Sequence, residues 1–392
     1  MSSKRAQKLL AQLRLERANT IRLLQQLVES ESPSHDPESQ QVVLDLLSDE
    51  LAALDYRIRR IPDHLTGGYL LGVPSSRPHG RPIQLLVGHC DTVWPRGTLE
   101  TMPITMRAGK MTGPGIYDMK GGLAQIISSL RALRALELEP EVAPVVLVNS
   151  YEEIGSSRSR GLVRRLAKTS DRVLVLEPAF GRRGKLKTAR KGVGQFTVRV
   201  RGKAAHAGLE PSKGVSAILE LSLVVQKLFA LNDPDRGISV NVGTIDGGMR
   251  SNVVAPASEA SVDVRVMTLE QATEIEAALR SLTPETPGAE VEIEGGFPLP
   301  PMEPTARNQA LWHLAEEAGR ELDLELIEGL AGGGSDGNVA SLYAPTLDGL
   351  GPMGDGAHAP HEHVVLDSLI ERGALLALIL LAPPSRRQDE DA

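Results

Sequence analysis

The side chains best suited to chemistry in this sequence are carboxylates and imidazoles that follow short apolar runs. They are His89, Asp91, Asp118, Glu152, Glu153 and Glu177. The apolar, β-branched runs before them predict buried strands, and only Asp118 lies instead in a glycine-rich loop, GPGIYDMKGG. Open α/β sheets bind ligands at the carboxyl ends of their strands. We therefore expect these six side chains to meet at one edge of a sheet.

So many neighbouring carboxylates repel one another and take up protons unless cations neutralise them. Imidazole and carboxylate ligands without a thiolate suit zinc, and also cobalt or manganese. If Asp118, Glu153 and Glu177 bind two divalent cations, the charges nearly balance, which favours a two-metal hydrolytic site that activates water. Adjacent residues of an extended chain project to opposite sides, so Glu153 can bind a metal while Glu152 acts as the general base.

The elements that would position these residues alternate between strand and helix. Apolar residues at helical spacing lead us to expect that residues 1–60 are helical, and glycines and prolines at 67–82 predict turns. The strands that carry the polar residues are separated by predicted helices at 123–136 and near 161–168. This order predicts an α/β fold with a mostly parallel sheet in a three-layer catalytic domain.

The pattern changes after residue 191. Residues 192–300 are predicted to run β-α-β-β-α-β, which is the order of a ferredoxin-like α+β unit. We therefore expect an inserted domain at 192–300 and a catalytic domain made of 1–191 and 301–392. The last residues, SRRQDEDA, are predicted to form a disordered tail.

Composition excludes several classes of protein. The 392 residues carry a net charge of −7 and only 3% aromatic residues, which disfavours nucleic-acid binding. The single cysteine, Cys90, excludes an intrachain disulfide framework and fits a reducing compartment. The charged amino terminus lacks the apolar core of a signal peptide, and the most apolar stretch, 374–382, is too short to span a membrane. We expect a cytoplasmic protein.

Eight segments in this order resemble the co-catalytic zinc family of glutamate carboxypeptidase. They are HCDTV, GPGIYDMKGG, SYEEIGS, LEPA, GKAAHAG, SNVV, GGGSDG and GAHAPHEHV. Relatives in that family include acetylornithine deacetylase, succinyl-diaminopimelate desuccinylase and aminoacylase. The resemblance covers nearly the whole chain and includes the predicted inserted domain, which it identifies as a dimerisation and lid domain.

The resemblance assigns a role to each candidate of the catalytic domain. It implies that His89 and Glu177 hold one zinc ion, that Glu153 and His358 hold the other, and that Asp118 bridges them. It implies that Asp91 orients the imidazole of His89 and that Glu152 is the base. The residues alone do not choose among His358, His361 and His363; the family pattern selects His358.

The resemblance also implies substrate contacts. His206 would reach the active site of the partner subunit of a homodimer and stabilise the oxyanion, with help from Asn252. Arg265 would contact a substrate carboxylate or is simply a solvated strand residue. The AGGGSDGN segment with Ser335 would bind a carboxylate through backbone N–H groups or is an ordinary helix entry.

One position departs from the family pattern. Relatives that release glutamate carry Arg before the PPME segment, where it clamps the substrate α-carboxylate, and here Leu299 occupies that place. The loss of a bidentate guanidinium removes a specific carboxylate contact. Arg250 could compensate from the lid, and Lys185 occupies a family-like substrate position.

We therefore expect a two-zinc hydrolase that cleaves an amide bond of a small peptide or N-acyl amino acid with a free carboxylate, in the manner of glutamate carboxypeptidase. The alternatives are an N-acyl-amino-acid deacylase and a metal-dependent binding protein without turnover. A two-metal phosphoesterase ranks below these, because no cluster of Arg or Lys flanks the ligands to hold a phosphate.

Overall fold

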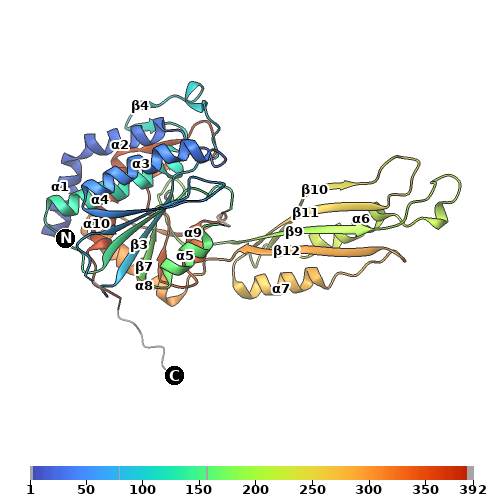
Figure 1. Ribbon diagram of the computed structural model, residues 1–392. Helices are drawn as coiled ribbons and strands as arrows, with labels where there is room; N and C mark the ends of the chain where they lie inside the picture. The colour runs from blue at the N-terminus through green and yellow to red at the C-terminus, as the bar shows by residue number, and fades with distance from the viewer. Residues whose placement is uncertain (1–2, 79, 156–157, 386–392) are drawn as a thin grey trace. The chain divides into compact units, whose positions relative to one another are not determined.

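The computed structural model describes residues 3–78, 80–155 and 158–385 (Figure 1). These residues form two compact units, each with its own hydrophobic core. The first unit consists of Met1–Thr188, Pro304–Leu330 and Ser335–Ala392, and the second consists of Ala189–Glu303 and Ala331–Gly334. The predicted tail lies outside the described residues from position 386 onward.

The first unit is built on a six-stranded sheet with the order β1-β2-β6-β3-β7-β14. The bounds are β1 Tyr56–Ile61, β2 Tyr69–Pro74, β3 Ile83–His89, β6 Ala143–Asn149, β7 Ser170–Val175 and β14 Thr346–Leu347. Strands β6, β3, β7 and β14 are parallel, whereas β1 and β2 pair in antiparallel fashion. Every residue of β3 and β6 is buried, so both faces of the central sheet are covered. The predicted mixed α/β fold is confirmed.

Helices surround this sheet, and α4 packs against α1, α2 and α10 (Figure 1). Their bounds are α1 Lys4–Leu15, α2 Arg17–Glu29, α3 Pro37–Ala53, α4 Gly121–Ala135, α5 Arg160–Ala167, α8 Ala306–Glu321, α9 Asp336–Ala340 and α10 Leu366–Leu380. Two smaller sheets lie wholly or mostly in this unit. They contain β4 Thr105–Arg107, β5 Lys110–Thr112, β15 Gly354–Asp355 and β16 His363–Val365, and the pair β8 Leu186–Arg190 with β13 Glu328–Ala331.

The prediction that residues 1–60 are helical is wrong at its end, because Tyr56–Ile61 form strand β1. The side chains of β1 alternate between partly buried and exposed through most of its length, which is the two-residue period of an edge strand. Between the glycines and prolines that predicted turns lies a further strand that was not predicted, β2, which pairs with β1 and β6. Both strands lie at one side of the sheet, next to β6, and contribute no predicted metal ligand.

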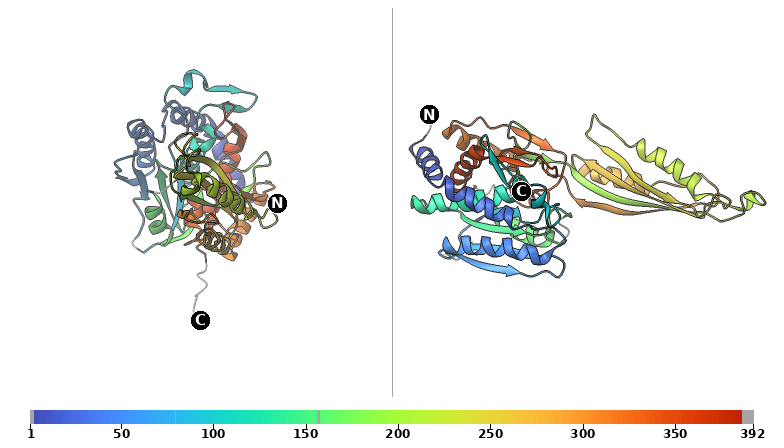
Figure 2. Two further views of the ribbon diagram at one scale, coloured as in Figure 1. Left: turned by 90° about the vertical axis from the view of Figure 1, so that its right-hand side faces the viewer. Right: turned by 90° about the horizontal axis from the view of Figure 1, so that it is seen from above.

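The second unit is a four-stranded antiparallel sheet with two helices lying along it (Figures 1 and 2). Its elements are β9 Gly192–Arg201, α6 Ala217–Phe229, β10 Ser239–Gly247, β11 Ala257–Val266, α7 Leu269–Arg280 and β12 Glu290–Leu299. The strand order β10-β11-β9-β12 places the first strand between the third and the fourth, as in a ferredoxin-like unit. Alternate residues of β9 are buried, so the helices cover one face of this sheet.

The second unit contains a buried acid that is hydrogen-bonded to its backbone. Glu220 on α6 is fully buried, and its carboxylate accepts hydrogen bonds from the backbone N–H groups of Glu285 and Thr286. Burial alone would raise the pKa of Glu220, but these hydrogen bonds outweigh it and the pKa is lowered. The charged form of Glu220 therefore stabilises this unit.

No helix among the described residues is both long and apolar enough to cross a membrane.

Candidate metal centre

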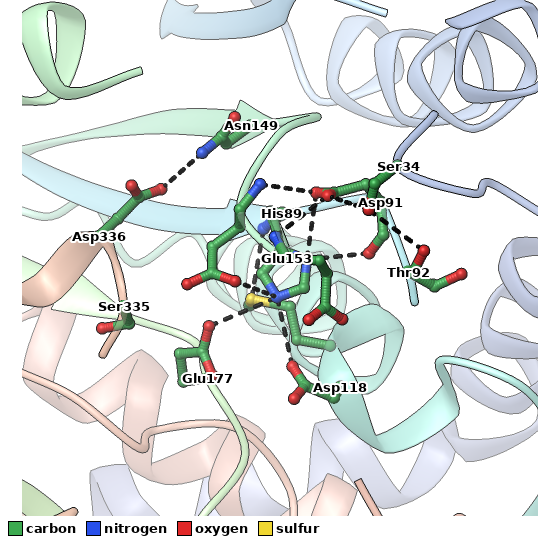
Figure 3. A network of polar contacts seen from close by, with 12 residues as sticks. Ser34, His89, Asp91, Thr92, Asp118, Asn149, Glu153, Glu177, Ser335 and Asp336 are labelled. Atoms are coloured by element: carbon green, nitrogen blue, oxygen red, sulfur yellow. Dashed lines mark hydrogen bonds and ion pairs between the residues drawn. The ribbon is translucent and has the colours of Figure 1, made fainter. Parts of the chain in front are cut away.

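The centre of the site is the imidazole of His89, which is the last residue of β3 and is only 1% exposed. Its Nε2 atom lies 3.2 Å from Oδ1 of Asp118 and 3.4 Å from Oε1 of Glu177 (Figure 3). Its Nδ1 atom lies 3.0 Å from the carbonyl oxygen of Asp91. Glu177 follows β7, the neighbour of β3 in the sheet, so adjacent strand ends bring these two residues together.

Asp118 links two imidazoles. Its Oδ1 faces His89, and its Oδ2 lies 3.5 Å from Nε2 of His358. The same Nε2 atom lies 3.0 Å from Oε2 of Glu153. Asp118 belongs to the segment Ile116–Lys120, and the peptide bond that follows it is cis. One carboxylate therefore presents one oxygen atom to each of two imidazole groups.

Asp91 binds the backbone of the glutamate pair. It is fully buried, and its carboxylate accepts hydrogen bonds from the backbone N–H groups of Glu152 at 3.1 Å and Glu153 at 3.2 Å, and from the hydroxyl of Ser34 at 2.8 Å (Figure 3). Its Oδ1 lies 3.5 Å from Nδ1 of His89, farther than its own carbonyl oxygen. The carboxylate of Asp91 thus holds the backbone of the two glutamates, and the carbonyl group contacts the imidazole.

The two glutamates reach different partners. Glu153 faces His358, whereas Oε2 of Glu152 lies 4.0 Å from Nε2 of His89. Two sets of ligand atoms lie close enough to share an ion, and they overlap at His89: one adds Glu152 and Glu177, and the other adds Asp118 and Glu153. By geometry Glu152 therefore belongs to one of the two potential ligand sets, in addition to its predicted role as the base.

Burial and mutual repulsion perturb the acids and bases of the site. Burial, with the nearby charge of Glu177, raises the pKa of Glu152 well above its usual range. Burial also raises the pKa of Glu153, to about 7. The pKa of His358 is raised to about 10 by its hydrogen bonds with Asp118 and Glu153. The raised pKa values of Glu152 and Glu153 mean that their charged forms are disfavoured unless positive charge lies beside them.

The residues fit a pair of divalent cations. The donor set contains imidazole nitrogen and carboxylate oxygen atoms without thiolate, which suits zinc, cobalt or manganese. Oε1 of Glu153 is buried and has no hydrogen-bond partner among the described residues, so it has a free lone pair to offer. An unsatisfied buried carboxylate oxygen is costly unless a cation or donor meets it.

Two charged residues beside the centre are not among the candidates predicted from the sequence. Lys187 on β8 is 6% exposed, and its Nζ atom lies 4.0 Å from Oε2 of Glu177. Glu362 is fully buried and accepts a hydrogen bond from the N–H of Asp118. The sequence shows Lys187 among other basic residues and Glu362 between His361 and His363. Neither pattern distinguishes these two residues from other charged residues of the chain.

Three predicted substrate residues belong to the second unit. Nδ1 of His206 accepts hydrogen bonds from the N–H groups of Gly208 and Leu209, and His206 is exposed. The carbonyl of Asn252 accepts from the N–H of Ala207, so His206 and Asn252 lie on paired segments. Arg265 on β11 forms an ion pair with Asp263 at 2.8 Å. Their roles toward a substrate stay predictions.

Ser335 precedes α9 in the first unit and is 1% exposed. Its hydroxyl donates to Asp348 at 2.6 Å and accepts from the N–H of Gly337, so it caps the helix. The prediction that this segment contacts a substrate carboxylate therefore depends on its backbone N–H groups.

Comparison with known proteins identifies the family. The family model described as "Peptidase family M20/M25/M40" matches residues 85–382, a range that contains all five predicted metal ligands. The chain belongs to peptidase family M20/M25/M40. The predicted resemblance is confirmed, and with it the expectation that the chain is a metal-dependent hydrolase.

Relatives within family M20 span most of the chain. Carboxypeptidase G2 of Pseudomonas sp. (strain RS-16) is 30% identical over 379 residues, which cover 93% of this chain and 89% of that protein. Succinyl-diaminopimelate desuccinylase of Paracidovorax citrulli is 29% identical and covers 89% of this chain and 94% of that protein. The crystal structure of aminopeptidase PepT from Bacillus cereus shares the fold, with a TM-score of 0.76 at 21% identity over 93% of this chain and 98% of that one.

Proposed function

We propose that this protein is a two-zinc amidohydrolase that releases a carboxyl-terminal amino acid from a small peptide or N-acyl amino acid, in the manner of carboxypeptidase G2. The observation that carries the proposal is the placement of Asp118, whose two oxygen atoms face His89 and His358 at 3.2 and 3.5 Å. A carboxylate between two imidazoles, each with a further carboxylate beside it, suits two cations held a short distance apart. Cobalt or manganese could replace zinc with the same ligand set.

In this proposal His89 and Glu177 would hold one ion, Glu153 and His358 would hold the other, and Asp118 would be a ligand of both. When bound, the ions would polarise the amide carbonyl group and lower the pKa of water. Glu152 takes a proton from the attacking water molecule and delivers it to the amide nitrogen as the C–N bond breaks. Burial raises the pKa of Glu152 in the metal-free protein, and cations beside it would lower that pKa, so that the carboxylate form can accept the proton.

The second unit supplies the remaining groups of the proposal. His206 stabilises the oxyanion in the site of a partner subunit, and Asn252 assists there. Self-association is supported by an edge strand, β10, and by exposed apolar side chains near it and on α6: Ile218, Leu219, Ile245 and Met249. We propose a homodimer in which this unit is also a closing lid, and a cytoplasmic location, which the single buried cysteine supports.

Mixed dimers test the shared site. Subunits with His206→Ala and subunits with Glu152→Ala should each be inactive alone, whereas exchanged mixtures should regain part of the activity, because one of the two sites in a mixed dimer is intact. Sedimentation must first show a dimer and labelled subunits must show exchange. If exchange occurs without recovery of activity, His206 does not act across the dimer.

A second candidate function is that of an N-acyl-amino-acid deacylase. Leu299 ends β12 at the position where the resemblance implies a carboxylate-binding Arg, and Arg265 is paired with Asp263. Acetylornithine deacetylases are among the relatives, for example that of Proteus mirabilis at 29% identity over 62% of this chain. This departure favours a substrate whose carboxylate is held by other groups.

A substrate panel decides between the candidates. The zinc-loaded protein is assayed with folyl-type and simple acyl-glutamates and with acyl derivatives of neutral and basic amino acids, acetylornithine included. Preference for acyl-glutamates supports the carboxypeptidase, and preference for acetylated basic amino acids supports the deacylase. Stoichiometric metal without hydrolysis of any amide would identify a binding protein and reject the proposal, and hydrolysis of a phosphoester alone would reject it as well.

A further inference from the structure

Glu362 is a buried carboxylate that is not one of the proposed ligands. It is fully buried and accepts four hydrogen bonds, two on each oxygen atom. The donors are the indole Nε1 of Trp94 at 2.8 Å and the N–H groups of Gly115 at 2.9 Å, Tyr117 at 2.8 Å and Asp118 at 3.1 Å. A buried carboxylate is tolerated only when its oxygen atoms are satisfied in this way.

Three of these donors come from one loop. The N–H groups of Gly115, Tyr117 and Asp118 converge on Glu362, and such convergence of successive backbone N–H groups is a typical anion-binding arrangement. Gly115 has a φ of +69°, and a Cβ atom there would lie 2.3 Å from a side-chain atom of Thr92. The loop that carries the proposed bridging residue is thus shaped to hold this one carboxylate.

Glu362 also belongs to the loop that carries the other ligand. His358 precedes it by four residues, and the turn between them is closed by hydrogen bonds from Ala359 to Gly356 and from Glu362 to Ala359. His358 has a φ of +60°, a left-handed conformation that costs a non-glycine residue free energy and persists only where the surroundings enforce it. Glu362 ties this strained loop to the loop of Asp118.

We propose that Glu362 is a positioning residue of the metal centre, which sets the spacing between Asp118 and His358 by binding the backbone of the Asp118 loop. Its four donors leave it no role as a ligand or a proton carrier. The competing explanation is that it stabilises the two loops without any effect on the metal ions. The inference rests on the proposed function, because it presupposes that Asp118 and His358 bind metal.

The substitution Glu362→Gln tests the proposal with little change of shape. Its carboxamide offers one oxygen acceptor, so in either orientation one of the two donor pairs faces an NH2 group. We expect the affinity for Zn²⁺, measured by competition with a chromophoric chelator, to fall roughly 10–100-fold, the usual effect of losing a partner that orients a metal ligand. Cobalt(II) absorption bands of the substituted protein should shift, because the ligand geometry changes.

Two matched variants serve as controls. Trp94→Phe removes the one donor that is not in the Asp118 loop, and His361→Gln alters the exposed neighbour of Glu362. Both should bind Zn²⁺ within about threefold of the unsubstituted protein, as expected for changes outside the orienting contacts. If Glu362→Gln binds Zn²⁺ within twofold of the unsubstituted protein, Glu362 is purely structural and the inference is overturned. If the unsubstituted protein binds no Zn²⁺, the proposed function fails instead.

A second measurement decides the matter even if Glu362→Gln does not fold. The chain has two tryptophans, so Trp312→Phe leaves Trp94 as the single fluorophore. Its indole donates to the carboxylate that also binds the Asp118 N–H, and Zn²⁺ titration should change its emission with the same midpoint as metal binding. Zn²⁺ binding without any change in the emission of Trp94 would overturn the inference.

Discussion

Replacing Lys187 by Met should weaken the metal-free protein and strengthen its binding of metal. Lys187 is 6% exposed, and its ammonium group lies 4.0 Å from Glu177. Burial would raise the pKa of Asp118, but hydrogen bonds with His358 and His89, with the charge of Lys187 beyond them, hold that pKa well below its usual range. Two divalent cations together with Lys187 would balance the charge of the five carboxylates around His89, which are those of Asp91, Asp118, Glu152, Glu153 and Glu177.

The expected loss of stability follows from the distance between Lys187 and Glu177. Two unit charges 4.0 Å apart attract by about 4 kcal/mol at an effective dielectric constant of about 20. Removing one member of a buried ion pair costs about 3–5 kcal/mol, and we expect the metal-free Lys187→Met protein to lose about 3 kcal/mol of stability. Bound cations supply the missing positive charge, so the loaded form should lose little. By linkage, metal affinity should rise roughly 10–100-fold, at about 1.4 kcal/mol per factor of ten.

The assay compares urea unfolding in chelator with unfolding in Zn²⁺, and measures Zn²⁺ affinity by competition. Met is unbranched and close in length to the lysine side chain, so packing changes little. Lys185→Met is the matched control, because Lys185 is partly exposed and forms no ion pair within the described part of the chain. Equal losses with and without Zn²⁺, or weaker Zn²⁺ binding, would refute the charge-balance reasoning.

The other predictions concern the base, the core of the second unit and the packing of α4. Glu152→Gln should retain both metal ions while the turnover rate falls about 10²–10⁴-fold, and loss of a metal ion would instead make Glu152 a ligand. Glu220→Gln should lower the unfolding free energy by about 1–3 kcal/mol at pH 7, since the carboxamide offers one uncharged acceptor oxygen in place of the two carboxylate oxygens that meet these N–H groups. Because the folded pKa of Glu220 is lowered from 4.5, this difference should shrink as the pH falls from 4.5 through the folded pKa, and a difference independent of pH would contradict the assignment. Gly122→Ala places a Cβ atom 2.0 Å from the carbonyl oxygen of Leu176 and should cost at least ~1–3 kcal/mol in thermal unfolding. Gly161→Ala on α5, where a Cβ atom meets nothing within 4 Å, should be neutral or stabilising, and similar effects of the two substitutions would contradict this packing.

Residue types and their order along the chain were sufficient to predict a metal-dependent hydrolase with a mixed α/β fold. Apolar runs followed by His89, Glu153 and Glu177 predicted strand ends with metal ligands, because a buried parallel strand is a continuous apolar run and its carboxyl end faces the ligand. The same periodicity did not predict β1, whose arginines alternate with partly buried residues directly after a long helix.

The tertiary structure decided what the residue types left open. They do not choose among His358, His361 and His363; the family pattern selects His358, and the folded chain places its Nε2 3.0 Å from Glu153, while His363 contacts the carbonyl group of His361. Lys187 and Glu362 are ordinary charged residues in the sequence, and their burial beside the centre follows from strand pairing and loop closure between distant segments. Local patterns record whether a residue suits the interior, but the partner that makes its burial tolerable comes from elsewhere in the chain.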